Sequence, residues 1–215
     1  YEDQALVVVD KPAQLVVHPA PGHQSGTLVN ALLHHCRDLS GVGGELRPGI
    51  VHRLDKDSSG VMVATKDDCT HRYLARQFKA HTVQRRYRAL VHGLVAEATG
   101  TIDQPIGRHP VHRKKMSTLA RSSRRAVTRW QVLRRYEADR LTLVDLSLET
   151  GRTHQIRVHM AGLNCPVVVD ATHRPDLART HEIRSAPTLL RVDPDGRVVG
   201  RVVGLPAIRA LAAHV

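Results

Sequence analysis

The sequence predicts an α+β fold, in which runs of β-strands are combined with a small number of helices. Three observations predict it. Strand-like segments follow one another directly in the middle of the chain, helical periodicity is confined to short stretches, and the two kinds of segment do not alternate as in βαβ units. The chain has 215 residues, enough for one large domain or two small ones with a buried core.

The N-terminal part predicts two short strands and a helix. ALVVVDKP (5–12) is an apolar run typical of a buried strand, and Pro12 ends it. LVVHPAPG (15–22) predicts a second short strand that runs into a turn. SGTLVNALLHHC (25–36) has the apolar spacing of a helix, with Ser25 as its N-cap.

The next segments flank a polar turn. IVHRL (50–54) and GVMVAT (60–65) are predicted strands on either side of it. DDCTHRYLARQFKAH (67–81) predicts a second helix, which Asp67 or Asp68 caps.

The central segments are mostly strand-like. Residues 85–95, 126–136 and 140–150 alternate apolar and polar side chains, and the last two form a predicted pair. Residues 151–163 fit either a strand, because they alternate, or a helix, for which Thr153 is available as a cap.

The composition favours a polyanionic partner. Lys and Arg number 32 against 20 acidic residues, which gives a net charge of +12 and a pI near 10.5. Such a balance is expected of a nucleic-acid-binding protein. A basic soluble protein from an arginine-rich proteome explains the charge equally well, so charge alone does not decide between them.

Cysteine use indicates a reducing compartment, and we expect a cytoplasmic protein. Cys36, Cys69 and Cys165 are far apart and odd in number, which does not suit a disulfide framework. No apolar run approaches the roughly 18 residues of a membrane span, and no signal peptide is visible. Because the chain opens at Tyr1 rather than at Met, we expect a fragment or a trimmed chain, which leaves an upstream domain open.

Three segments combine polar side chains with apolar neighbours. They are HRLDKDSSG (52–60), Tyr87 within RRYRALV, and GRTHQIRVH (151–159). An aspartate in a turn beside strands, such as Asp55, can act as a nucleophile, a general base or a simple turn residue. A nucleophile must stay ionised, which calls for a fixed cation such as Arg157. Taken alone, each segment is explained as well by an ordinary turn, a core tyrosine or a solvated basic face.

A metal site is the weaker hypothesis. The chain has 15 histidines, but HExxH and Cys/His pairs at zinc-finger spacing are missing, apart from the adjacent His34, His35 and Cys36. We therefore expect no metal.

Taken together and in order, these motifs are more specific than any one of them. HRLDKDSSG, RRYRALVHG and LETGRTHQIRVHMAGLNCPVVVD resemble the signature segments of the RluA-type pseudouridine synthases, most closely the large-subunit ribosomal RNA type D enzymes. The resemblance implies a pseudouridine synthase fold, with a mixed, mostly antiparallel central sheet, flanking helices and a catalytic cleft. It also implies isomerisation of specific uridines in 23S ribosomal RNA, without a cofactor.

The resemblance assigns roles to individual residues. Asp55 matches the catalytic aspartate, Arg157 the arginine that pairs with it, and Tyr87 the tyrosine that stacks on the uracil. Arg53 matches the arginine that fills the gap left by the flipped uridine, and Ile156 the apolar residue against the base.

RNA contacts are expected from two further groups of residues. His52, Arg152 and His154 stand beside the catalytic positions. The basic segment 108–125 would follow the RNA backbone, and its Arg113, Lys114 and Lys115 are the contacts we select. A solvated loop is the alternative for that segment. We expect a monomer that binds RNA and no membrane.

The resemblance covers about residues 1–170, which we predict to be the catalytic domain. Residues 171–215 diverge, and we expect them to form a closing hairpin and a helix of the same domain, with the turn DPDG (193–196) between its strands. This tail also resembles the last hairpin of a thioredoxin-like domain, in which Pro187 would be a cis proline. No CxxC motif accompanies it, so redox chemistry does not follow.

Two departures from the family pattern bear on the backbone. Gln14 and Asn164 each stand where the family usually has glycine, and Gln14 costs about 1 kcal/mol if its turn requires a positive φ. A non-catalytic RNA-binding or ribosome-assembly protein on the same scaffold is the alternative function. The intact Asp55, Tyr87 and Arg157 argue against that alternative, while the divergent tail argues for it.

Overall fold

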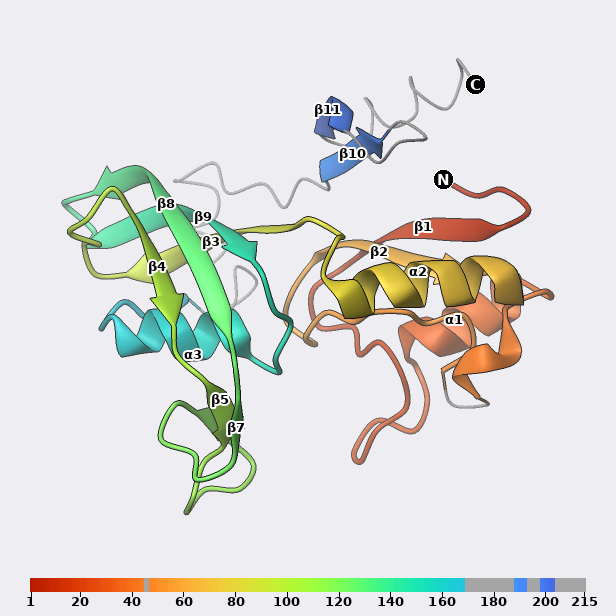
Figure 1. The fold of residues 1–215 in the computed structure, drawn as a ribbon, viewed down its shortest axis with the longest axis horizontal. Coiled ribbons are helices and arrows are strands. Elements are labelled where there is room, and N and C mark those ends of the chain that lie inside the picture. The colour runs from red at the N-terminus through yellow and green to blue at the C-terminus, as the bar shows by residue number, and fades with distance from the viewer. Residues whose placement is uncertain (45–46, 169–187, 193–197, 204–215) are drawn as a thin grey trace. The chain divides into compact units, whose positions relative to one another are not determined.

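The computed structural model describes residues 1–44, 47–168, 188–192 and 198–203. They belong to two compact units (Figure 1). One unit comprises Tyr1–Ala80 together with Arg184–Val215, and the other comprises His81–Ile183. All strand ladders in the described residues are antiparallel, and helices are few, which confirms the α+β class.

The first unit is built on a two-stranded ribbon. Strand β1 (Leu6–Lys11) pairs with β2 (Gly60–Thr65) in an antiparallel register that sets Val8 opposite Val63. Helix α2 (Asp68–Ala80) packs against β2 and against the short 3-10 helix η1 (Gly41–Gly43).

Helix α1 (Leu28–His35) begins at Thr27, so the predicted cap at Ser25 is wrong. The Thr27 hydroxyl accepts the Asn30 N–H, while the Asn30 side chain accepts the Thr27 N–H at 3.0 Å. This reciprocal pair satisfies two backbone donors that an open helix end would leave without partners. Ser25 lies two residues before this cap, and Gly26 between them takes a left-handed conformation, with φ of 68°, that does not belong to the helix.

Residues 15–19 do not form the predicted strand, although the turn after them is present. The carbonyls of Val16 and Val17 accept the N–H groups of Leu28 and Val29, at 2.8 and 2.9 Å. The segment therefore supplies acceptors to the start of α1, and its apolar character reflects burial rather than ladder pairing.

Residues 50–54 are not a strand either. Ile50 makes a single bridge to Ala64, and the next free donor of β2, the Val63 N–H, is taken by the His52 side chain at 3.1 Å. A side chain thus replaces the backbone partner that a ladder would need.

The predicted helix 67–81 is confirmed, with Asp67 as its cap. The Asp67 carboxylate accepts the Thr70 N–H at 2.8 Å. His71, on the buried face of α2, is 3.0 Å from the Thr65 hydroxyl at the end of β2, and this bond ties the helix to the ribbon.

The second unit is a four-stranded antiparallel sheet in the order β3-β9-β8-β4. Its strands are β3 (Arg85–His92), β4 (Thr99–Asp103), β8 (Val127–Tyr136) and β9 (Leu141–Leu148). The three strands predicted for residues 85–150 are therefore confirmed.

Helix α3 (Gln155–Gly162) packs against β8, which settles the ambiguous segment 151–163 as a helix. Its buried Gln155, His159 and Met160 share one face. The cap position is His154, in the left-handed conformation, and not Thr153. The alternation that suggested a strand arises because the buried face of the helix is partly polar.

A hydrophobic core lies between the sheet and α3. Its buried members come from three elements and from the segments beside them: Val91, Val95, Val144, Leu146, Met160 and Cys165. The chain reaches Cys165 through Asn164, whose φ of 57° is a conformation that asparagine tolerates better than most residues. Asparagine can therefore stand at this glycine position of the family pattern.

A smaller three-stranded sheet carries the basic segment 108–125. It consists of β5 (Ile106–Arg108) between β6 (Met116–Ser117) and β7 (Ser123–Arg124). Figure 1 shows it beyond the ends of β4 and β8, as an extension of the second unit.

The two predicted C-terminal strands are present. Strands β10 (Thr188–Val192) and β11 (Val198–Val203) pair antiparallel as a hairpin. The predicted turn 193–196, the proposed cis proline Pro187 and the predicted final helix lie outside the described residues. Among the described helices, none has the length and apolar character that crossing a bilayer requires.

Gly49 makes the tightest backbone approach of the first unit, and it yields a stability prediction. Its φ is 69°, and a Cβ added there would lie 2.5 Å from the Thr65 carbonyl oxygen. We expect Gly49→Ala to lower the free energy of unfolding by at least about 2 kcal/mol, because strain and clash add. Gly41→Ala, which meets no atom within 4 Å, should cost less than about 1 kcal/mol. Urea unfolding followed by circular dichroism compares the two, and equal losses would contradict the prediction.

Candidate active site

Asp55 opens a four-residue turn that leads into β2. The Ser58 N–H donates to the Asp55 carbonyl at 3.1 Å, which closes the turn. Leu54, with 8% of its surface exposed, anchors the preceding residue in the core, while Asp55 is half-buried. Gly60 then enters the strand with a φ of 134°, a conformation that suits glycine. The backbone thus presents the carboxylate from a short and closely held loop.

Lys11 lies under this turn and was missed by the sequence analysis. It is fully buried, and its ammonium group donates to three carbonyls, those of Pro12, Leu15 and Lys56, at 2.9, 2.8 and 3.1 Å. An ammonium has three donors, so every one is satisfied. The only signal in the sequence was a lysine at the end of an apolar strand.

The electrostatics of Lys11 couple it to the turn. Burial lowers the pKa of its ammonium, and the carboxylates of Asp57 and Asp55 act in the opposite direction. The Lys11 charge therefore lies near both carboxylates of the turn, while its hydrogen bonds hold the backbone of the turn in place.

His52 is held from two sides. Its ring stacks on Phe78 of α2 at 4.7 Å between centroids, and its Nε2 accepts the Val63 N–H. An Nε2 that accepts a hydrogen bond does not carry a proton. The His52 ring therefore has a structural function, in addition to the RNA contact predicted for it. Arg53, the next residue, is exposed.

Arg53 belongs to a basic neighbourhood in the first unit. Burial, Arg47 and Arg53 all lower the pKa of His18, which is itself buried. This arrangement keeps His18 neutral and gathers two guanidinium groups near the start of the turn.

Tyr87 and Ile156 pack against the same hydrophobic core in the second unit. Tyr87 lies on β3 opposite Leu146 of β9, and Ile156 lies in the first turn of α3. Both are half-buried and both pack against the core that contains Leu146 and Met160. Two residues that are 69 positions apart in the sequence therefore pack against one hydrophobic core.

Gln155 fixes the start of α3 and was also missed. Its side-chain amide donates to the Val127 carbonyl and to the Thr128 hydroxyl, at 2.9 and 3.0 Å. Its amide oxygen accepts the Thr150 hydroxyl and the Arg152 N–H, at 2.8 and 3.0 Å. All of these bonds are buried or partly buried, so they set the orientation of the residues that follow.

The predicted basic residues at this helix have different environments. Arg152 donates from Nε to the Arg125 carbonyl at 2.9 Å, so its guanidinium is partly committed to the fold. His154 takes the left-handed cap position, and Arg157 is half-buried on α3. Asp55 belongs to the first unit, whereas Tyr87 and Arg157 belong to the second, and the pairing of Asp55 with Arg157 remains a prediction.

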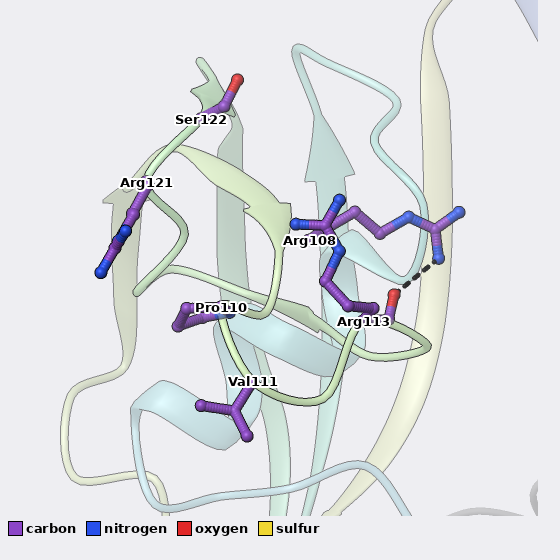
Figure 2. A pocket seen from close by; sticks show the side chains of 6 residues that line it. All are labelled: Arg108, Pro110, Val111, Arg113, Arg121 and Ser122. Atoms are coloured by element: carbon purple, nitrogen blue, oxygen red, sulfur yellow. Dashed lines mark hydrogen bonds between the residues drawn. The ribbon is translucent and has the colours of Figure 1, made fainter.

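The basic segment contains a pocket of about 490 Å³ (Figure 2). Its lining combines three arginines with smaller side chains: Arg108, Pro110, Val111, Arg113, Arg121 and Ser122. Two hydrogen bonds shape the loop beside it, because the His109 Nδ1 accepts the N–H groups of Val111 and His112 at 3.1 and 3.0 Å.

Charge around the pocket is not neutralised. Within the described chain, carboxylates pair with Arg125 and Arg129, but no ion pair involves the three arginines of the pocket. Lys114 and Lys115 are exposed on the same loop. The arrangement suits an anionic ligand such as a phosphodiester.

The chain belongs to the RNA pseudouridylate synthase family, because the model of that family matches residues 5–162. A protein of Aquifex aeolicus named as an uncharacterized RNA pseudouridine synthase is 53% identical over 173 residues, which cover 80% of this chain and 54% of the relative. The protein named ribosomal large subunit pseudouridine synthase D in Pseudomonas aeruginosa is 51% identical over 173 residues, 80% of this chain and 52% of the relative. The chain thus spans about half the length of these relatives.

A solved structure supports the fold. The human RNA pseudouridylate synthase domain containing 1 superposes with a TM-score of 0.65 and 27% sequence identity, over 80% of this chain and 67% of that one. The pseudouridine synthase fold expected from the motifs is therefore confirmed.

His159 makes the second unit sensitive to acid. It is 1% exposed, between the Thr128 hydroxyl at 2.9 Å and the Gln104 carbonyl at 3.0 Å, and its burial lowers the pKa of the ring. Because the unfolded chain then binds the proton more readily, we expect the free energy of unfolding to fall as the pH drops below the ordinary histidine pKa of about 6.5, by up to about 1.4 kcal/mol per pH unit.

The variant His159→Gln should reduce this pH dependence, since it removes the titrating ring. Urea unfolding at several pH values, followed through the fluorescence of the single tryptophan, Trp130, reports on the second unit. His34→Gln, at an exposed position of the other unit, is the control and should keep the wild-type slope. Equal slopes for wild type and His159→Gln would refute the assignment.

Proposed function

We propose that this chain isomerises uridines in RNA, with Asp55 as the reacting group. Its membership of the RNA pseudouridylate synthase family supports the reaction class. The observation that supports the role of Asp55 is the closed turn in which it lies. Buried Lys11 fixes this turn by a hydrogen bond to the Lys56 carbonyl, and buried Leu54 fixes the residue before Asp55. A carboxylate fixed in this way has the limited freedom that a nucleophile requires.

The reaction needs no external reagent. The C1′–N1 bond of the uridine breaks, the uracil rotates, and a C1′–C5 bond forms; the proton at C5 is lost and N1 gains one, so the atoms balance. In this proposal Asp55 attacks the ribose or the base, the bond that it forms breaks again as the product is completed, and Arg157 keeps the carboxylate ionised. Tyr87 stacks on the uracil and accepts the C5 proton. Tyr87 and Ile156 pack against the same core cluster, which agrees with two side chains that hold the same base.

Access to a base in folded RNA requires that the nucleotide leaves the stack. Flipping costs a few kcal/mol, and we assign its compensation to Arg53, which is exposed beside the turn and close to the basic His18–Arg47 neighbourhood. A guanidinium both stacks and carries charge, so it can occupy the gap in the RNA.

The proposed substrate is large-subunit ribosomal RNA of the 23S type. The names of relatives such as the Pseudomonas aeruginosa protein support this choice. We assign the arginine pocket of segment 108–125 to the RNA backbone, because its three guanidinium groups have no carboxylate partners within the described chain.

Replacement of Asp55 tests the reaction. We expect Asp55→Asn to abolish tritium release from ribosomal RNA labelled at uridine C5, because the amide is not a nucleophile, while RNA binding persists. Asp57→Asn, which alters the neighbouring exposed carboxylate, is the matched control and should retain most of the activity. Near wild-type release by Asp55→Asn would remove Asp55 from this role. RNA binding without release by the wild type would favour the non-catalytic alternative.

Replacement of the pocket arginines tests the RNA backbone contact. We expect Arg113→Gln and Arg121→Gln each to weaken RNA binding and to lower the slope of log K against log salt by about 0.7–0.9. Arg134→Gln, about 20 Å along β8 from its first residue, removes the same charge and should leave the slope unchanged. Filter binding at several salt concentrations measures these slopes, and identical slopes for all variants would reject the contact.

A further inference from the structure

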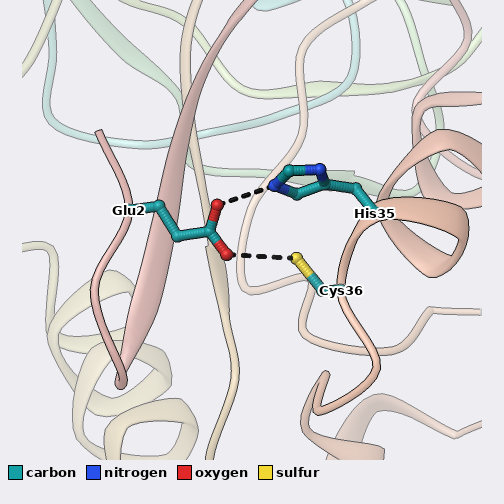
Figure 3. A group of neighbouring side chains, drawn as sticks. All are labelled: Glu2, His35 and Cys36. Carbon is teal, nitrogen blue, oxygen red and sulfur yellow. Dashed lines mark hydrogen bonds and ion pairs between the residues drawn. The ribbon is translucent and has the colours of Figure 1, made fainter.

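Three side chains of metal-binding types lie close together in the first unit. Glu2 is far from His35 and Cys36 in the sequence, so spacing alone does not reveal the cluster. The Glu2 Oε2 and the His35 Nε2 are 2.7 Å apart, and the Cys36 Sγ lies 3.8 Å from the Glu2 Oε1 (Figure 3). One ligand atom from each residue lies within 4.8 Å of the other two. In the part of the chain that the structure describes, no other trio of His, Cys, Asp or Glu side chains meets this condition.

The backbone holds these residues from two directions. His35 is the last residue of α1, and Cys36 caps the helix through its N–H, which donates to the Leu32 carbonyl at 2.7 Å. Glu2 is positioned because the N-terminal segment folds back along β1, where it forms an antiparallel bridge with Val7. Secondary structure therefore forms the cluster without any ligand.

The donor set matches zinc. Carboxylate oxygen, imidazole nitrogen and cysteine sulfur are the atoms that bind Zn²⁺ in proteins, at about 2.0–2.3 Å. A tetrahedron with those bond lengths separates its ligand atoms by about 3.3–3.7 Å. The observed separation of 2.7 Å between the Glu2 Oε2 and the His35 Nε2 is shorter than that range, and all three ligand atoms lie within 4.8 Å of one another, so movements of about 1 Å would form the site.

We propose that Glu2, His35 and Cys36 bind a Zn²⁺ ion, with water as the fourth ligand. The thiol of Cys36 gives its proton to solvent as the sulfur–zinc bond forms. The ion fastens the N-terminal segment to the end of α1 and so stabilises the first unit. This site is independent of the isomerase reaction.

The charges around the cluster fit this ion. The Glu2 carboxylate and the Cys36 thiolate supply two negative charges against the two positive charges of zinc. Lys66 donates to the Glu2 Oε1 at 2.8 Å, which leaves Oε2 facing His35 as the metal ligand. A partner on the second oxygen is a usual feature of ligating carboxylates.

Cobalt provides the spectroscopic test, because Co²⁺ reports its ligands by absorption. Titration of the whole chain with Co²⁺ should give a thiolate-to-metal charge-transfer band and tetrahedral d–d bands that saturate at one ion per chain. One equivalent of Zn²⁺ should remove both. Absence of the thiolate band in the wild type would overturn the proposal.

Matched variants assign the ligands. His35→Ala, at an exposed position that the fold does not need, should weaken Co²⁺ binding at least about tenfold, and Cys36→Ser should remove the charge-transfer band. His34→Ala and Cys69→Ala change an exposed neighbour and an exposed cysteine and should match the wild type. Binding that survives His35→Ala, or a band lost in Cys69→Ala, would refute this ligand set.

A stability measurement gives a second readout. Zn²⁺ in excess should raise the thermal unfolding midpoint of the wild type and of His34→Ala, but not that of His35→Ala, because a ligand that binds only the folded state stabilises it. An equal rise in His35→Ala would show that zinc acts elsewhere and would reject the site.

Discussion

The position of the candidate nucleophile depends on one buried ammonium group. Removal of a charge from water costs several kcal/mol, so Lys11 must satisfy all three of its donors within the fold. It does so with the carbonyls of Pro12, Leu15 and Lys56. These acceptors come from the end of β1, from the turn after it and from the Asp55 turn. A single side chain therefore joins three segments, and Gln14, with a φ of 68°, adopts a strained conformation within the turn that this arrangement requires.

In the second unit, a neutral side chain fixes the segment that carries the proposed site residues. Gln155 is buried and makes four hydrogen bonds, two as donor and two as acceptor. They join α3 to β8 and to the segment before the helix. Gln155 directly precedes Ile156 and Arg157 in the chain. In the first unit, Lys11 binds the carbonyl of Lys56, the residue that follows Asp55. In both units a saturated buried polar group thus stands next to the proposed reacting residues, which is how a fold preorganises a site.

Arginines in two parts of the second unit have different partners. Arg88, Arg125 and Arg129, on or beside the main sheet, pair with carboxylates. The arginines of the pocket in segment 108–125 keep their charge available to a phosphodiester. Within the described residues, the pocket therefore differs from the main sheet in that its three arginines have no carboxylate partner.

The sequence by itself determined the α+β class, the strands β1, β2, β3, β8 and β9, the helices α1 and α2, and the motif that contains Asp55, because these depend on periodicity and turn chemistry over a few residues. Tertiary structure decided which distant segments these elements meet. Residues 15–19 serve α1 as acceptors, His52 replaces a strand partner, and Lys11 reaches the Lys56 carbonyl. Glu2 meets His35 in the same way. Each of these depends on packing between distant segments, and neither local propensity nor spacing in a single sequence records which distant partner a buried polar group will find.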